Sequence, residues 1–413
     1  MQSPAELTVD LRQLVITIAH TVDLVGVDDL LHGRRVGMLA AELAKRMGWS
    51  DAERVMLYDA GLLHDCGVSS TRVHRRLVDD LEWEGAQEHC DRGFALLKDF
   101  PPLAHLAPII LYHHTRWEQF DPAMQVQDTA RYANLIYLAD RIDVLAAPYQ
   151  ADQTVLEHSS AIRERLAAER GRLFSPELVD AFLALSEEEA FWLALRPDWV
   201  QQYQAQIESF ADSRTIDWAG IKQCAEIFAA IIDAKSSYTE QHSRGVARLA
   251  RHLAARLGLD WASCEKIEVA GLLHDIGKLQ IPDEIIEGTN PLTEHEFDLM
   301  KGHSYGTLQV LWRLQAIQDI ARWAAYHHET PDGHGYPFHL RGDDLPLPAR
   351  IINVADVFQA MAQDRPYRAA MAPEKILSTL QERVAAGSAD ADVVAALAAD
   401  LQNCHRIALA TGA

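Results

Sequence analysis

Residues 271–278 contain the densest group of side chains that could do chemistry, because His274 and Asp275 are followed there by Gly277 and Lys278. A neutral imidazole beside a carboxylate suits Fe, Mn, Zn or Co better than Mg or Ca. Adjacent positions on a helix point about 100° apart. We therefore expect Gly277 to unwind the last helical turn, so that both side chains face one point. The stretch predicts the start of a divalent-metal site.

Seven residues of the second half are candidate metal ligands: His242, His274, Asp275, His303, His327, His328 and Asp356. Seven ligands exceed the need of one ion, which predicts two divalent ions about 3.5–4 Å apart, bridged by Asp275 and a hydroxide. Such a pair activates water and neutralises phosphodiester oxygens, which predicts phosphoester hydrolysis. Asp275 and Lys278 are the predicted catalytic residues, since the Lys278 ammonium could hold a phosphate oxygen or assist the leaving alkoxide.

The first half carries the same ligand types in the same order, as a second metal site: His32, His64, Asp65, His89, His113, His114 and Asp140. In both sets the first two histidines are 32 positions apart, and the third and fourth are 24 apart. This shared order and spacing indicates an internal duplication. Val68 stands where the second half has Lys278. We therefore expect this site to bind metal in a secondary or regulatory role rather than to be an inert scaffold.

The segments that carry these residues have the apolar spacing of helices, for example at 5–18, 30–47 and 55–63, without strand-like alternation. The sequence therefore predicts an all-α fold of two tandem helical domains. We expect the first domain at 1–150 and the second at 213–413. Between them, residues 151–212 read as a helical connector that is broken near Gly171, Pro176 and Pro197.

Residues 221–370 resemble an HD-GYP domain, a branch of the HD superfamily of metal-dependent phosphohydrolases. The resemblance rests on the ligands above, on residues 271–278, on residues 327–337 and on the Arg-Pro-Tyr-Arg stretch at 365–368. It implies a bimetallic or trimetallic centre, with iron or manganese typical, and cyclic di-GMP as the usual substrate. It also implies substrate contacts by five residues: Gly335, Tyr336, Pro337, Arg365 and Arg368.

The first half resembles a plain HD domain, without the Lys and without the Gly-Tyr-Pro loop. The tandem arrangement is similar to a subgroup in which some members hydrolyse 3′,3′-cyclic GMP-AMP or linear dinucleotides such as pGpG. Some family members hold a third ion with a Glu one turn before the first His. Here that position is Tyr238, which favours two ions, whereas Asp28 precedes His32 by four residues and reads as a solvated residue at a helix end.

Composition limits the partners. The formal net charge of −22 argues against binding a nucleic-acid polymer, but it does not exclude a small anionic substrate beside metal ions. No apolar run reaches the roughly 18 residues of a membrane span, and no secretory signal is visible. Five scattered cysteines read as free thiols in a reducing cytosol. We expect a cytoplasmic protein with a small dinucleotide substrate, no membrane partner, and helical faces compatible with a homodimer.

Two other functions remain open from the sequence. The same metal ligands would serve a nucleotidase or phosphomonoesterase of the wider HD superfamily. In such an enzyme the Gly-Tyr-Pro loop, Arg365 and Arg368 would contact a different substrate. Alternatively, the metals could be structural, and the chain could be a non-enzymatic nucleotide-binding module. Lys278 argues against this last reading for the second half.

Overall fold

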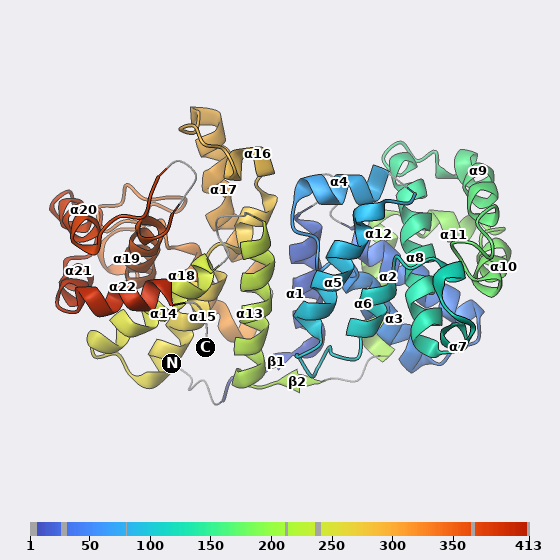
Figure 1. Cartoon of the computed structure of the whole chain (residues 1–413), viewed down its shortest axis with the longest axis horizontal. Helices are drawn as coiled ribbons and strands as arrows, with labels where there is room; N and C mark the ends of the chain where they lie inside the picture. Colours follow the sequence, from blue (N-terminus) through green and yellow to red (C-terminus); the bar gives the residue numbers. More distant parts are fainter. Residues whose placement is uncertain are drawn as a thin grey trace. The chain divides into compact units, whose positions relative to one another are not determined.

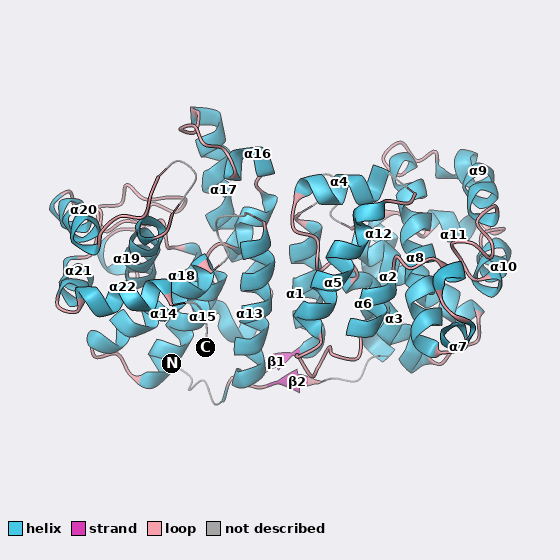
Figure 2. Cartoon of the chain, viewed as in Figure 1, coloured by secondary structure: helices cyan, strands magenta, loops and turns pink. Residues whose placement is uncertain are grey.

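The structure, a computed structural model, describes residues 6–25, 31–79, 81–210, 214–235, 241–364 and 368–410. The chain divides into two compact units. One consists of Leu14–Arg214, and the other combines Met1–Gln13 with Thr215–Ala413. Both are built almost entirely of helices (Figures 1 and 2), which confirms the predicted all-α fold.

The first unit is a bundle in which α2 and α8 pack against several other helices. Its helices are α1 (Leu11–Asp23), α2 (His32–Arg46), α3 (Asp51–Leu63), α4 (Thr71–Asp79), α5 (Gln87–Leu97), α6 (Ala107–Tyr112), α7 (Pro122–Gln125), α8 (Asp128–Ala146), α9 (Val155–Ala167), α10 (Pro176–Leu185), α11 (Glu189–Leu193) and α12 (Pro197–Phe210). Helices α9 to α12 are packed into this unit, where α10 and α12 contact α2. Pro176 and Pro197 each take the first position of a helix, where no backbone donor is lost.

The second unit repeats this bundle around α14, α15 and α19. Its helices are α13 (Trp218–Ala234), α14 (His242–Arg256), α15 (Trp261–Leu273), η5 (Ile276–Gln280, 3₁₀), α16 (Asp283–Ile286), α17 (Glu294–Leu311), α18 (Gln318–Ala325), α19 (Leu347–Ala362), α20 (Pro373–Ala385), α21 (Ala391–Ala398) and α22 (Leu401–Leu409). Asp260 caps α15 by accepting a hydrogen bond from the Ser263 amide at 2.7 Å, as Ser50 caps α3 in the first unit.

The N-terminal segment differs from the helix expected over 5–18. Residues Val9–Asp10 form strand β1, which pairs antiparallel with β2 (Thr215–Ile216). Helix α1 begins only at Leu11, because the Asp10 carboxylate accepts a hydrogen bond from the Arg12 amide at 2.7 Å and so caps the helix. These are the only two strands among the described residues.

Close helix packing places the ends of α3 and α15. A Cβ on Gly61 would lie 2.5 Å from the Cα of Gly37, and a Cβ on Gly271 would lie 2.7 Å from the Cα of Ala247. Helices α2 and α3, and likewise α14 and α15, therefore cross almost in backbone contact. The crossing brings the first His of each set, at the start of α2 or α14, next to the His-Asp pair at the end of α3 or α15.

Candidate metal centre

Asp275 lies at the centre of the second-unit cluster, and its two carboxylate oxygens face different histidines. Oδ2 is 3.2 Å from Nε2 of His274 and 3.7 Å from Nε2 of His242. Oδ1 is 3.6 Å from Nε2 of His303 and 3.7 Å from Nε2 of His327. A carboxylate oriented this way can bind one ion with each oxygen.

The other ligands form two groups, one on each side of Asp275. His242, His274 and Asp356 form one group, and His303, His327 and His328 form the other; within each group the ligand atoms lie within 4.8 Å of one another. In the first group, Asp356 Oδ1 is 3.2 Å from Nε2 of His242. The structure thus brings together all seven residues that the sequence singled out.

Backbone carbonyls orient the histidines so that Nε2 points into the cluster. Nδ1 of His274 donates to the carbonyl of Gly271 at 2.8 Å, Nδ1 of His327 donates to that of Ala324 at 2.7 Å, and His303 has the same arrangement with Met300. With the proton on Nδ1, the Nε2 lone pair is available to a metal ion. Nε2 of His274 and Oδ1 of Asp275 are buried and have no hydrogen-bond partner in the part of the chain that the structure describes. Buried polar atoms are rarely left without partners, so a nitrogen and an oxygen with free lone pairs here fit the coordination of a metal ion.

The electrostatics of the cluster keep the carboxylates charged and the second group of histidines neutral. Burial alone would raise the pKa of Asp275, but the facing His274 and the Lys278 ammonium outweigh burial and hold this pKa well below its usual range. Burial and the neighbouring His303 lower the pKa of His328 to about 3. Burial also lowers the pKa of His303 to about 4. Neutral imidazole and ionised carboxylate are the forms that bind metal.

Gly277 acts differently from the expectation. Helix α15 does end at Leu273, but Gly277 is not among the described glycines with positive φ. A Cβ at Gly277 would instead lie 1.9 Å from the carbonyl oxygen of His303. The glycine is needed because η5 passes directly against α17, which brings Asp275 next to His303. Lys278 follows in η5, and its Nζ lies 2.6 Å from Asp275 Oδ2.

The Gly-Tyr-Pro loop lies beside the second group of ligands. The ring of Tyr336 is 4.8 Å from that of His328, centroid to centroid. The carboxylate of Glu329 fixes the loop by accepting hydrogen bonds from the amides of Phe338 at 2.6 Å and Leu340 at 2.9 Å. The sequence motifs alone assigned Glu329 no role. Its position directly after the paired histidines is the sequence feature that could have identified it.

A cavity of about 600 Å³ opens at this loop. Its lining includes Gly335, Tyr336 and Pro337, which places all three loop residues next to His328. Arg368, in contrast, donates a hydrogen bond to the carbonyl of Ala360 and has its guanidinium against the sulfur of Met371. Arg365 and Tyr238, like Asp28 of the first half, fall outside the described residues.

Two further residues that the sequence did not assign hold ligands in place. Nδ2 of Asn353 donates to the carbonyl of His327 at 2.7 Å. Oε1 of Gln359 accepts from Nδ1 of His242 at 2.5 Å. Both residues lie on α19, which also carries Asp356. A hydrogen bond to the far nitrogen of a ligating His fixes its tautomer and orientation.

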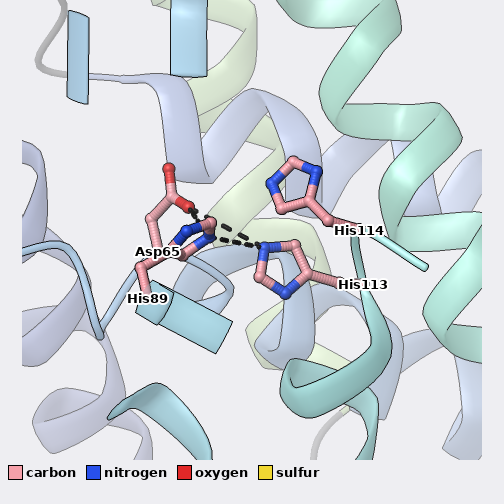
Figure 3. Close-up of side chains that lie close together, drawn as sticks. All are labelled: Asp65, His89, His113 and His114. Carbon is pink, nitrogen blue, oxygen red and sulfur yellow. Dashed lines mark hydrogen bonds and ion pairs between the residues drawn. The ribbon is translucent and has the colours of Figure 1, made fainter. Parts of the chain in front are cut away.

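The first unit has a cluster of the same design (Figure 3). Asp65 Oδ2 is 3.3 Å from Nε2 of His64, and Asp65 Oδ1 is 3.2 Å from Nε2 of His89. Figure 3 shows Asp65 and His89 with His113 and His114 beside them, and these four residues form one potential metal-binding group. His32, His64 and Asp140 form the other. All seven predicted ligands of this half therefore also lie in one cluster.

The surroundings of the two clusters differ. In the first unit, Asp143 stands where the second has Gln359; it accepts from Nδ1 of His32 at 2.8 Å and pairs with Arg35 at 2.5 Å. Arg141 stands where the second has Val357, and its buried guanidinium lies 2.7 Å from Asp140 Oδ2. The first cluster thus has an arginine where the second has the apolar side chain that lines its cavity.

No described helix combines the length and the apolar character needed to cross a membrane. The five cysteines are all buried and free, as the sequence predicted.

Comparison with known proteins identifies two HD domains, which match residues 30–145 and 226–393. The chain is 36% identical over 410 residues to 3′3′-cGAMP-specific phosphodiesterase 1 of Vibrio cholerae, covering 98% of this chain and 95% of the relative. It is 32% identical to phosphodiesterase 3 of the same organism, covering 74% of this chain and 65% of that one.

The structural comparison agrees with the sequence matches. A crystal structure of the cyclic GMP-AMP phosphodiesterase V-cGAP3 of V. cholerae matches with a TM-score of 0.65 and 26% identity. The match covers 96% of this chain and 98% of that one. The similarity thus extends over both halves and confirms the resemblance inferred from the sequence. The chain therefore belongs to the family of tandem HD-domain phosphodiesterases.

Proposed function

We propose that this protein hydrolyses a cyclic dinucleotide, with 3′,3′-cyclic GMP-AMP as the first candidate substrate, at the second-unit cluster. The observation that carries the proposal is the orientation of Asp275, whose two oxygens face two separate groups of ligands. The relatives named above are described as acting on cyclic GMP-AMP. A relative in Xanthomonas campestris, 38% identical over 154 residues, is described as a cyclic di-GMP phosphodiesterase, which makes cyclic di-GMP the second candidate.

The roles of the residues follow from their positions. Two divalent ions, iron or manganese, would supply Lewis-acid activation of the phosphate and of a water molecule. Asp275 would hold both ions, and the carbonyl-bound histidines would keep their Nε2 atoms aimed at them. Lys278 would hold a non-bridging phosphate oxygen, because its ammonium already lies inside the cluster. Tyr336 would contact the nucleotide, and we retain Arg365 and Arg368 as further substrate contacts.

The test is hydrolysis of cyclic GMP-AMP, cyclic di-GMP and pGpG by protein loaded anaerobically with Fe(II) or Mn(II), followed by chromatography. Asp275→Ala should abolish turnover, and full activity in that variant would refute the assignment. Faster turnover of mononucleotides than of any dinucleotide would select the nucleotidase reading. Tight dinucleotide binding without turnover in metal-loaded protein would select the binding module.

We further propose that the first-unit cluster binds metal without hydrolysing the dinucleotide. It has the ligand set and the bridging orientation of Asp65, but it has Val68 in place of the lysine and Arg141 at Asp140. Metal analysis of the Asp65→Ala variant should show fewer bound ions per chain while hydrolysis continues. Loss of hydrolysis in a folded Asp65→Ala protein would place the chemistry in the first unit.

A further inference from the structure

The cavity beside His328 extends beyond the metal ligands to side chains with no role so far. Its lining includes Phe297 and Lys301 on α17 and Arg383 near the end of α20. A cyclic dinucleotide has two phosphates and two bases, and the metal cluster accounts for only the phosphate that is cleaved. The remaining parts of the substrate need partners of their own.

Arg383 has an unused hydrogen-bond donor. Its Nε is buried and has no hydrogen-bond partner among the described residues. Lys301, the other cation named above, already pairs with Asp298 at 2.8 Å. Of the arginines whose buried Nε has no partner among the described residues, Arg383 is the one that lines this cavity, so a molecule bound there can supply the acceptor. The planar guanidinium group can donate two parallel hydrogen bonds to a phosphate. The chain has a net charge of −22, so a cation in this cavity favours the binding of an anion there.

Phe297 offers an aromatic surface at the same cavity. The residue is 43% exposed, and the Lys301 ammonium lies 4.7 Å from the centroid of its ring. Its ring lies 5.9 Å from that of Tyr336 in an edge-to-face arrangement. Aromatic side chains of this kind contact nucleobases through their π-faces.

We propose that Arg383 binds the phosphate that is not cleaved and that Phe297, together with Tyr336, contacts a base of the dinucleotide. This inference rests on the proposed function of the second unit. It assigns α17 and α20 the task of distinguishing a cyclic dinucleotide from a smaller phosphodiester. Arg383 and Phe297 are thus specificity-determining residues.

The experiment compares two substrates in the full-length, metal-loaded protein. One is the preferred cyclic dinucleotide, and the other is bis(p-nitrophenyl) phosphate, a diester with a single phosphate and no base. Arg383→Met should raise KM for the cyclic dinucleotide about tenfold or more, because a charge-assisted hydrogen bond is lost. The ratio of kcat/KM for the dinucleotide to that for the small diester should fall by a similar factor.

Further variants separate this role from a structural one. Arg383→Lys keeps the charge and should recover part of the lost ratio, and Phe297→Tyr should recover what Phe297→Leu loses. Lys375→Met, at an exposed position on the same helix, is the matched control and should leave both substrates unaffected. Thermal melting and metal content identify any variant that fails to fold.

Two different negative results would separate an error in the proposed function from an error in the proposed subsite. If the wild type cleaves the small diester but no cyclic dinucleotide, the proposed function itself is wrong. If the wild type cleaves the dinucleotide and the ratio is unchanged in folded Arg383→Met and Phe297→Leu proteins, the proposed subsite is wrong and the proposed function stands.

Discussion

Replacing Gly277 by alanine tests how the fold builds the proposed catalytic centre. The added Cβ would lie 1.9 Å from the carbonyl oxygen of His303, far inside normal contact, and 2.8 Å from the amide nitrogen of Thr307. Both neighbours are backbone atoms, so η5 and α17 must move apart by about 1 Å, and overpacking of this kind typically costs about 1–3 kcal/mol of stability. The movement separates Asp275 from His303, and a misplacement of about 1 Å can lower a catalytic rate about a hundredfold.

The chain supplies two matched controls for this substitution. A Cβ at Gly67 in the first unit would lie 2.0 Å from the carbonyl oxygen of His89, so Gly67→Ala imposes the same steric cost at the other cluster. Gly302 is exposed on α17, and no atom of the described residues lies within 4 Å of an added Cβ there. Gly302→Ala should stabilise the helix by a few tenths to about 1 kcal/mol, because alanine favours helix more than glycine does.

The assay combines kcat for the cyclic dinucleotide, thermal melting and metal content per chain. We expect Gly277→Ala and Gly67→Ala to lower Tm similarly, with only Gly277→Ala losing about a hundredfold in kcat. Wild-type kcat in Gly277→Ala would refute the argument from close backbone approach. An equal loss of kcat in Gly67→Ala would refute the assignment of hydrolysis to the second unit.

Four other changes have defined expected outcomes. Lys278→Met should lower kcat about a hundredfold with metal content unchanged, because Lys278 is a donor and not a ligand; loss of metal would contradict this role. Gln359→Leu removes the acceptor of His242 Nδ1 and should weaken metal binding about tenfold or more, as measured by competition with a chelator. Arg35 and His32 outweigh the effect of burial and lower the pKa of Asp143 to about 2. The stabilisation of metal-free protein by Asp143 is therefore complete above its unfolded-state pKa of about 3.9 and is lost as the pH falls toward 2. Asp143→Asn should accordingly lower the urea midpoint more at pH 7 than at pH 3, and an equal effect at both would contradict the ion pair. Removing metal with a chelator should lower Tm, since an ion present at about a hundredfold over its Kd adds about 2.7 kcal/mol of stability; an unchanged Tm after verified metal loss would contradict the coupling of metal to folding.

The sequence by itself determined the ligand types, their order and the duplication. These features are readable because each ligand lies in a short motif, such as His274-Asp275-Ile276-Gly277-Lys278, and because the two halves repeat the same spacings. The helical spacing of apolar residues likewise predicted the all-α fold, since amphipathic periodicity is a local property of the chain. The absence of Lys in the first half was visible in the same way, at Val68.

Only the tertiary structure decided how these motifs meet. The two oxygens of Asp275 face opposite groups because η5, which directly follows Asp275, packs against α17 through the backbone approach at Gly277. The hydrogen bonds of Glu329 and Gln359, and the place of Arg383 in the cavity, depend on contacts between helices and loops that are separated in sequence. The pairing of β1 with β2 joins residues more than two hundred positions apart, and no local pattern predicted it. The sequence resemblance pointed to the Gly-Tyr-Pro loop, but only long-range packing decided that Phe297 and Arg383, from two other helices, line the same cavity.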